Sequence, residues 1–242
     1  MILDAFWHKT MPQFYGVNKI GSISEWQRII PAEHWVPGRS AYELAHHWHG
    51  CDGFPSRVAA ALQPAFPRLI PDYGMVEMPV FLDTLKAPSR TDIMLYCGTQ
   101  TQEPVIVGVE GKATEAFDDP VSNWIRHDHP APTPSRVRRL RFLSEVLGAE
   151  ISPEARFGYQ LVHRTASIVS ECLLRGAASG VLIVHSFLDA PKNWSDFQAF
   201  TSFLGIQNVQ KDVVAGPAQL GPKREIKMFF VWVTDHPSQQ EA

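Results

Sequence analysis

Three charged residues near the middle of the chain have the types and spacing of a metal-assisted hydrolytic site. Glu110 and Lys112 are two residues apart in VIVGVEGKATE, which is typical of a strand, so their side chains point to the same face. Charges inside a sheet must be paired or bind a metal, and VIVGV is apolar on both faces, which indicates a covered strand. The alternative is a surface ion pair on a half-exposed sheet, which would contribute little.

A second carboxylate is expected beside this pair. The segments TDIMLYCG and PVIVGVEG are predicted strands joined by a short hairpin. If the hairpin is symmetric about Thr101, Asp92 lies opposite Glu110 at about 5 Å, and the two carboxylates repel unless a cation binds between them. With a main-chain carbonyl at Gly111 or Lys112, they form an oxygen-rich site for Mg²⁺ or Mn²⁺. Lys112 would position or deprotonate a water, or neutralise a phosphate, as phosphodiester hydrolysis requires.

The composition is that of a globular protein with a substantial core. The chain has 242 residues, 45% of them hydrophobic, which favours one large domain or at most two small ones. A net charge of −3 excludes a global basic field, so nucleic-acid binding would depend on a local patch. Cys51, Cys97 and Cys172 are far apart and lack metal-ligand spacing, which is typical of reduced thiols in a cytoplasmic protein. Neither a secretory signal nor a membrane span is predicted.

The order of helices and strands predicts a mixed α/β domain. Short helices are expected in the first third, the clearest being SAYELAHHWHG at 40–50. Three strands at 75–86, 91–98 and 104–111 precede a helix in RVRRLRFLSEVLG and a long helix at 153–175. A strand at 180–188, a helix at 195–204 and a strand at 227–235 complete the chain. The phenylalanines of the helix at 195–204 would serve either the core or a homodimer.

This arrangement resembles the PD-(D/E)xK nuclease superfamily. The acid lies in RTDIML on the second strand, and E-x-K lies in VGVEGKA on the third. No proline precedes Asp92, a departure that the superfamily tolerates. The resemblance covers residues 40–188 and implies a restriction-endonuclease-like core of αβββαβ order, with a mixed central sheet flanked by helices. Within a single domain of residues 1–242, residues 1–39 would form an N-terminal helical cap, and 189–235 would add a C-terminal helix and strand.

The resemblance also implies further site residues. YQLVHRTASIVSE places Gln160 and Arg164 one turn apart, similar to the helix whose glutamine approaches the metal or the scissile phosphate in many members. Some members supply a glutamate from the first core helix, and Glu43 occupies that place. Simpler interpretations exist. Gln160 and Arg164 would belong to a solvated face on which Arg164 interacts with Glu171, and Glu43 would complete a capping box with Ser40.

The remaining charged residues near this region have two interpretations each. Glu115 lies beyond the strand and either faces solvent or joins the metal site. The arginines of RVRRLR are either a solvated helix face or the best local patch for a phosphate backbone. The residues expected to bind nucleic acid are Arg164, Arg136, Arg138 and Arg139.

A histidine cluster in AHHWHGCDG offers a different metal chemistry. His46 and His49 share a helix face, which would suit zinc, although no paired second half such as C-x-x-C occurs elsewhere. Histidines that stabilise a helix C-terminus through the helix dipole are the simpler interpretation.

The function expected from the sequence is a Mg²⁺- or Mn²⁺-dependent endo- or exonuclease acting on DNA in preference to RNA. Two alternatives are an inactive nuclease-fold module for nucleic-acid binding or assembly, and a zinc metallohydrolase that uses His46 and His49. The expected metal ligands are Asp92 and Glu110, and the expected catalytic residues are Asp92, Glu110, Lys112, Gln160 and Glu43.

Overall fold

The computed structural model describes residues 12–83, 87–127 and 129–238. None of the helices in these ranges is long and apolar enough to cross a membrane. The strands are β1 (Gln13–Tyr15), β2 (Lys19–Ile20), β3 (Ile70–Val80), β4 (Ser89–Gly98), β5 (Pro104–Lys112), β6 (Ser179–Ser186), β7 (Ala215–Leu220) and β8 (Ile226–Thr234). The helices are α1 (Ile23–Gln27), α2 (Ser40–Trp48), α3 (Ser56–Leu62), α4 (Val121–Trp124), α5 (Pro134–Leu147), α6 (Tyr159–Arg175) and α7 (Pro191–Phe203).

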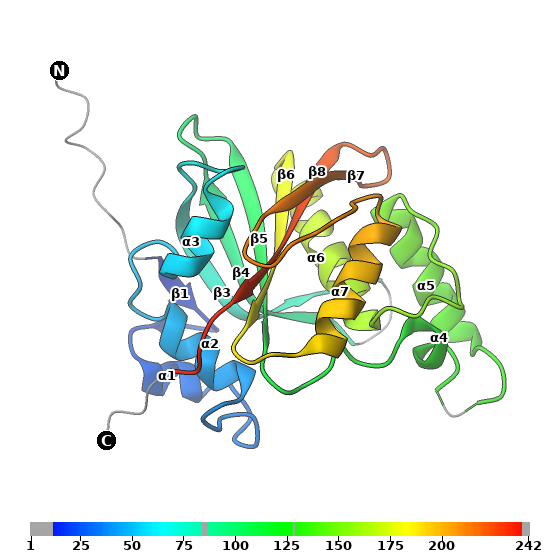
Figure 1. The fold of residues 1–242 in the computed structure, drawn as a ribbon, viewed down its shortest axis with the longest axis horizontal. Coiled ribbons are helices and arrows are strands. Elements are labelled where there is room, and N and C mark those ends of the chain that lie inside the picture. Colours follow the sequence, from blue (N-terminus) through cyan, green and yellow to red (C-terminus); the bar gives the residue numbers. More distant parts are fainter. Residues whose placement is uncertain (1–11, 84–86, 128, 239–242) are drawn as a thin grey trace.

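The strands form one mixed sheet in the order β2-β1-β3-β4-β5-β6-β8-β7 (Figure 1). Neighbouring strands are antiparallel from β3 to β5 and parallel from β5 through β6 to β8. In the β4–β5 hairpin Ile93 pairs with Val109 and Gly98 with Pro104, so the hairpin is symmetric about Thr101 as predicted. The predicted mixed α/β class with a central sheet flanked by helices is therefore confirmed.

Helices cover both faces of the sheet. Helices α1, α2 and α3 pack on one face through residues such as Trp26, Trp48 and Val58, whereas α4 to α7 pack on the other (Figure 1). Helix α2 lies so close to β5 that a Cβ at Gly111 would meet Leu44 at 2.6 Å. The glycine between Glu110 and Lys112 thus brings the start of α2 next to the charged end of β5.

Several element boundaries differ from those predicted. The expected helical cap contains the strands β1 and β2, and β7 was not predicted. Strand β3 begins at Ile70 because the proline of IPDYG is accommodated beside a bulge between Pro71 and Tyr73, while Gly74 pairs in regular register with Leu95. It ends at Val80, and residues 84–86 of the predicted strand lie outside the described ranges. Helix α6 begins at Tyr159 because Ser152 accepts a hydrogen bond from the Glu154 amide in a separate turn.

The phenylalanine-rich segment belongs to the core. Phe197 and Phe200 of α7 are fully buried against the sheet, with Phe200 packed edge-on to Phe230 of β8. The core therefore accounts for these two phenylalanines without a second protein chain.

Candidate functional site

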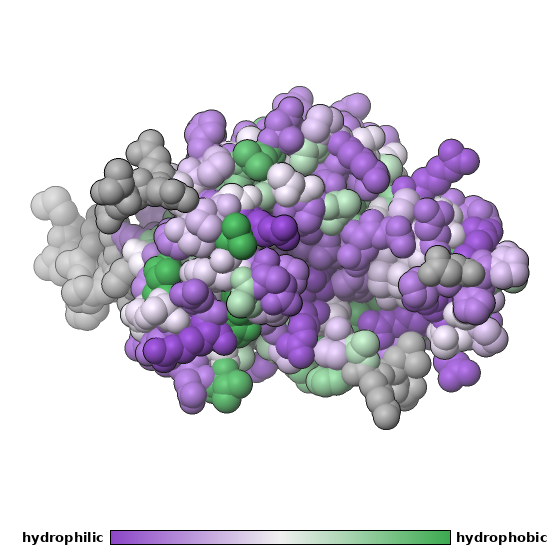
Figure 2. Space-filling model, turned by 90° about the horizontal axis from the view of Figure 1, so that it is seen from below, coloured by the Kyte–Doolittle hydropathy of each residue, from purple (hydrophilic) through white to green (hydrophobic). Residues whose placement is uncertain are grey.

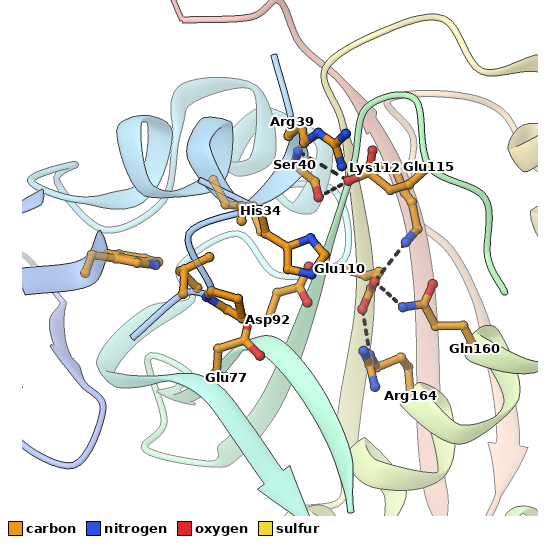
Figure 3. A pocket seen from close by; sticks show the side chains of 15 residues that line it. His34, Arg39, Ser40, Glu77, Asp92, Glu110, Lys112, Glu115, Gln160 and Arg164 are labelled. Carbon is orange, nitrogen blue, oxygen red and sulfur yellow. Dashed lines mark hydrogen bonds and ion pairs between the residues drawn. The ribbon is translucent and has the colours of Figure 1, made fainter. Parts of the chain in front are cut away.

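A cavity of about 420 Å³ lies where β3, β4 and β5 meet the N-terminal parts of α2 and α6 (Figure 3). The corresponding face of the molecule is largely hydrophilic and is hollowed near its middle (Figure 2). The open end of the β4–β5 hairpin and the starts of α2 and α6, which lie on opposite faces, all meet at the same end of the sheet. The polar residues lining the cavity are His34, Arg39, Ser40, Glu77, Asp92, Glu110, Lys112, Glu115, Gln160 and Arg164.

Glu110 is the centre of a buried ion-pair network. Its Oε1 accepts hydrogen bonds from Nζ of Lys112 at 3.0 Å and from Nε2 of Gln160 at 2.6 Å, and its Oε2 accepts one from Nε of Arg164 at 2.6 Å (Figure 3). Burial would raise the pKa of Glu110, but the two cations outweigh burial and hold the pKa below its usual value. Glu110 is therefore ionised, as a metal ligand must be.

Asp92 and Glu77 have the opposite electrostatic character. Burial, reinforced by Glu110 and Glu77, raises the pKa of Asp92 well above its usual value. Burial, opposed by Arg164 and reinforced by Glu110, also raises the pKa of Glu77. Oδ2 of Asp92 accepts a hydrogen bond from the Gly111 amide at 2.9 Å, so the carboxylate is held against the E-x-K strand. The cavity thus holds two carboxylates that bind protons more tightly than usual, which is common at functional sites.

Glu77 was not among the residues expected from the sequence. It lies on β3 with φ of 52°, a left-handed conformation that is costly for a residue with a side chain. Val76 packs with the α2 side of the sheet whereas Met78 packs with the α6 side, so the usual alternation of side chains is interrupted at Glu77. In the β3–β4 register, Val76 pairs with Ile93 and Met78 with Thr91, which places Glu77 opposite Asp92. The signal in the sequence that could have identified Glu77 is its position as a single acid inside the apolar run MVEMPV.

The donor set suits a hard cation held by two carboxylates. Glu77, Asp92 and Glu110 do not offer three oxygens within 4.8 Å of one another, so these three do not form a closed metal cluster. The Lys112 carbonyl accepts a hydrogen bond from the Phe187 amide, but the Gly111 amide points to Asp92. Because amide and carbonyl of one strand residue point to the same neighbour, the Gly111 carbonyl is the main-chain oxygen directed towards Asp92.

A buried acceptor without a partner supports this fit. Oε1 of Gln160 is buried and has no hydrogen-bond partner among the described residues, although the same amide donates to Glu110 through Nε2. An unpaired buried carbonyl is costly, so its presence beside Glu110 indicates a position for a water or a cation.

Arg164 is held in place by a further layer of buried polar residues. Its Nη1 donates to Oγ of Ser89 at 3.1 Å, and that hydroxyl lies 2.8 Å from Nδ1 of His163. Burial lowers the pKa of His163 to about 4, so this imidazole is neutral at pH 7 and its Nδ1 accepts hydrogen bonds. The orientation of Arg164 towards Glu110 is therefore fixed by its surroundings.

Comparison with known proteins gives one match. A family model described as "Domain of unknown function (DUF6946)" matches residues 19–237. The chain belongs to the DUF6946 family. No curated protein and no solved structure matches it. The matched part of this DUF6946 chain includes every residue that lines the cavity.

The structure places most of the expected site residues of the DUF6946 chain in this one cavity. Asp92, Glu110, Lys112, Gln160 and Arg164 all line it. The alternative of a solvated α6 face is wrong for Arg164, whose exposed fraction is 8% and whose partner is Glu110. Glu171 is instead bound by the hydroxyl of Tyr96 at 2.8 Å. Helix α6 lies across β4, β5 and β6, which turns this polar stripe inward.

Of the two glutamates for which two interpretations were open, Glu115 lines the cavity and Glu43 does not. Glu43 does not line the cavity, and its carboxylate accepts hydrogen bonds from the amides of Gly38 at 2.8 Å and Ser238 at 2.5 Å. Glu115 lines the cavity and accepts hydrogen bonds from the amide and the hydroxyl of Ser40. The capping box proposed for Ser40 and Glu43 is therefore absent, because Ser40 lies inside α2 and binds Glu115.

The three α5 arginines differ in their surroundings. Arg138 is exposed, whereas Arg136 is half-buried, lies over the ring of Trp124 and donates to the Trp124 carbonyl. Arg139 is buried and its Nη1 donates to Asp83 at 2.6 Å. Of the three, Arg138 is therefore the one whose guanidinium is freely presented to solvent.

The histidines form a different group from the one expected. Nδ1 of His46 is bonded to the Tyr42 carbonyl at 2.8 Å, and the His46 ring stacks on that of Tyr42. Within the described ranges, only His47, His185 and Asp235 bring three potential metal-ligand atoms within 4.8 Å. The indole of Trp48 donates to Nδ1 of His185 at 3.1 Å, so the neutral ring carries its proton on Nε2, 3.3 Å from Asp235. That nitrogen has no lone pair for a metal.

Proposed function

We propose that this DUF6946 protein is a divalent-metal-dependent nuclease that hydrolyses phosphodiester bonds. The observation that carries the proposal is that Asp92, Glu110 and Lys112 line one cavity from two adjacent strands. A restriction-endonuclease-like core is part of the proposal, and it is supported by the order α2, β3, β4, β5, α6, β6, to which α3 and the pair α4 and α5 are additions. DNA is the substrate proposed in preference to RNA.

Asp92, Glu110 and the Gly111 carbonyl would hold Mg²⁺ or Mn²⁺. A cation there would supply positive charge to the phosphate and lower the pKa of a bound water. The raised pKa of Asp92 supports this assignment, because a buried acid near two others gains most from a cation. Since Asp92 must lose its proton to bind the ion, metal affinity should increase with pH.

The neighbouring residues have distinct roles in this proposal. Lys112, whose Nζ lies 3.0 Å from Glu110, would orient the attacking water or neutralise the phosphate. Gln160 positions Glu110 through its amide nitrogen and presents its unpartnered oxygen to the same space. Arg164 keeps Glu110 ionised, which preserves a ligand for the cation.

The test is a cleavage assay on single- and double-stranded DNA and RNA, with Mg²⁺, Mn²⁺ or EDTA. We expect cleavage that is abolished by EDTA and by Asp92→Asn. The matched control is Asp235→Asn, which removes a carboxylate from the His47–His185 group on the other face of the sheet and should leave cleavage intact. Cleavage that is equal in Asp92→Asn and the wild type would contradict the proposal.

A second candidate is an inactive nuclease-fold module for nucleic-acid binding or assembly. It is favoured by the pairing of both Glu110 oxygens with protein donors, which leaves that carboxylate satisfied without a metal. Titration with Mn²⁺ separates the two functions. Binding by the wild type and by Asp235→Asn, but not by Asp92→Asn, supports the nuclease, whereas binding by none of the three supports the inactive module.

A further inference from the structure

The N-terminal segment, residues 26–44, forms the wall of the cavity that faces the three carboxylates. The apolar residues Ile30, Pro31 and Leu44 lie on this wall, and His34 and Arg39 lie at its exposed part. Figure 3 shows His34 and Arg39 on the α2 side of the cavity, across from Gln160 and Arg164. The cavity therefore has a floor of three acids and two cations, and a basic, partly apolar roof.

We propose that this cavity binds one unpaired nucleotide, with its phosphate on Arg39 and His34 and its base or sugar against Ile30 and Pro31. The proposal rests on the nuclease function and names its substrate class. That class is single-stranded nucleic acid, or a strand that has separated from its complement, rather than an intact duplex.

The size of the cavity supports a single nucleotide. Its volume of 420 Å³ is at the lower end of the roughly 300–1,000 Å³ found for small-molecule sites. This volume is that of a site for one small molecule rather than for two paired nucleotides with their backbones, so on this proposal the nucleotide that reaches Asp92 leaves its partner first.

The charges of the roof are placed to bind a phosphate. Arg39 and His34 are exposed, and among the described residues the Arg39 side chain has no ion pair with an acid, whereas His34 lies near enough to Glu77 to interact with its charge. The guanidinium of arginine matches a phosphate with two parallel hydrogen bonds. Glu115 already occupies the amide and hydroxyl of Ser40 at the start of α2. Binding of the phosphate therefore falls to Arg39 and His34 rather than to the helix end.

The first test measures binding without turnover. Thymidine 5′-monophosphate is titrated, in the presence of Mn²⁺, into the wild type, Arg39→Ala, His34→Ala and Arg28→Ala. Arg28 is the matched control, since it is an exposed arginine of the same segment that does not line the cavity. We expect affinity at least tenfold weaker in Arg39→Ala, severalfold weaker in His34→Ala and unchanged in Arg28→Ala. Equal affinity in all four proteins, or none in the wild type, overturns the proposal.

The second test addresses strandedness. A single-stranded 12-mer and a relaxed, covalently closed circular duplex, which has neither ends nor loops, compete for the Lys112→Ala protein, in which the proposed metal ligands are intact. We expect the single strand to compete at least tenfold better, and equal competition overturns the proposal. If the closed duplex is cleaved as fast as the single strand, the proposed nuclease function is supported but the binding of one unpaired nucleotide in the cavity is contradicted. If the nucleotide binds in an Arg39-dependent way but no substrate is cleaved, the nucleotide site is supported and the nuclease function is contradicted.

Discussion

Two groups of buried charged residues lie on neighbouring strands but on opposite faces of the sheet. Gly111 of β5 pairs with His185 of β6 in the parallel ladder. Glu110 binds Arg164 of α6 on one face, whereas His185 accepts a hydrogen bond from Trp48 of α2 on the other. The first group opens onto the 420 Å³ cavity, and the second, formed by Trp48, His185, Asp235 and His47, lines none of the described cavities.

The two groups differ in how well their charges are balanced. Hydrogen bonding to His185 and nearby imidazoles outweighs burial and lowers the pKa of Asp235 to about 2. Burial and like charges instead raise the pKa of Asp92. The surroundings thus stabilise the ionised form of Asp235 and destabilise the ionised form of Asp92. The difference teaches that burial of charge alone does not distinguish the candidate site from the second group, whereas an unbalanced charge beside a cavity does.

The largest effect is expected for Lys112→Ala. Loss of the amine should lower the cleavage rate by about 10²- to 10⁴-fold, the usual range for a positioned acid–base group. Mn²⁺ affinity should be retained, because Asp92, Glu110 and the Gly111 carbonyl remain. His47→Ala is the control from the other group and should cleave at the wild-type rate. A fully active Lys112→Ala protein would contradict the role proposed for this amine.

The next comparison concerns stability and contrasts two arginines. Arg164→Met removes one of the two cations that pair with buried Glu110 and should reduce the free energy of unfolding by about 3 kcal/mol, the lower end of the cost of breaking a buried ion pair, because Lys112 remains. Arg57→Met removes a half-exposed ion pair with Asp235 and should cost less than about 1 kcal/mol. Urea denaturation in EDTA measures both. If both substitutions lowered the free energy of unfolding equally, the two groups would not differ in how strongly they depend on their arginines.

A third comparison concerns the effect of ionisation on stability, which has opposite signs for Asp235 and Asp92. Asp235 has a folded pKa of about 2, below its unfolded value, so its stabilisation is present above pH 4 and lost as pH falls towards 2. Asp235→Asn should therefore cost about 2 kcal/mol at pH 7 and little near pH 2. Asp92 has a raised folded pKa, so its ionisation removes stability as pH rises above about 4.

Asp92→Asn should accordingly stabilise the metal-free protein at pH 7. We expect a rise in Tm of about 2 °C or more, which corresponds to roughly 1 kcal/mol in a domain of this size. The gain should fade towards pH 3, where Asp92 is largely protonated in both the folded and the unfolded state. Thermal unfolding in EDTA at the two pH values checks the sign, and a lower Tm for Asp92→Asn at pH 7 would show that Asp92 is well compensated.

The parts of the site that depend on local chain geometry were predictable from the sequence. The alternation of side chains puts Glu110 and Lys112 on one face, and the five-residue connection TQTQE fixes the register that brings Asp92 beside them. Glu77 was missed because its positive φ interrupts that same alternation. The pairing of Arg164 was missed because it depends on how α6 lies across the sheet.

The roof of the cavity depends on long-range packing. His34 and Arg39 lie in an irregular segment whose position is set by the contact of α2 with β5 at Gly111. No periodic pattern in residues 28–39 indicates that contact. The histidines of α2 illustrate the same limit. The helical spacing of the sequence groups His46 with His49, whereas in the structure His47 lies beside His185 of β6 and Asp235, which follows β8.

The smallest effect is expected for His46→Ala. His46 stacks on Tyr42 and bonds to its carbonyl one turn earlier, so its loss should change the free energy of unfolding by no more than about 0.5 kcal/mol. The zinc content of the purified protein should be negligible in both the wild type and the variant, because His185 presents a protonated nitrogen to Asp235. Stoichiometric zinc that is lost in His46→Ala would restore the metallohydrolase alternative. Zinc lost only in His47→Ala would instead show that the Trp48–His185 hydrogen bond gives way to a metal, and that the second charge group is also unbalanced.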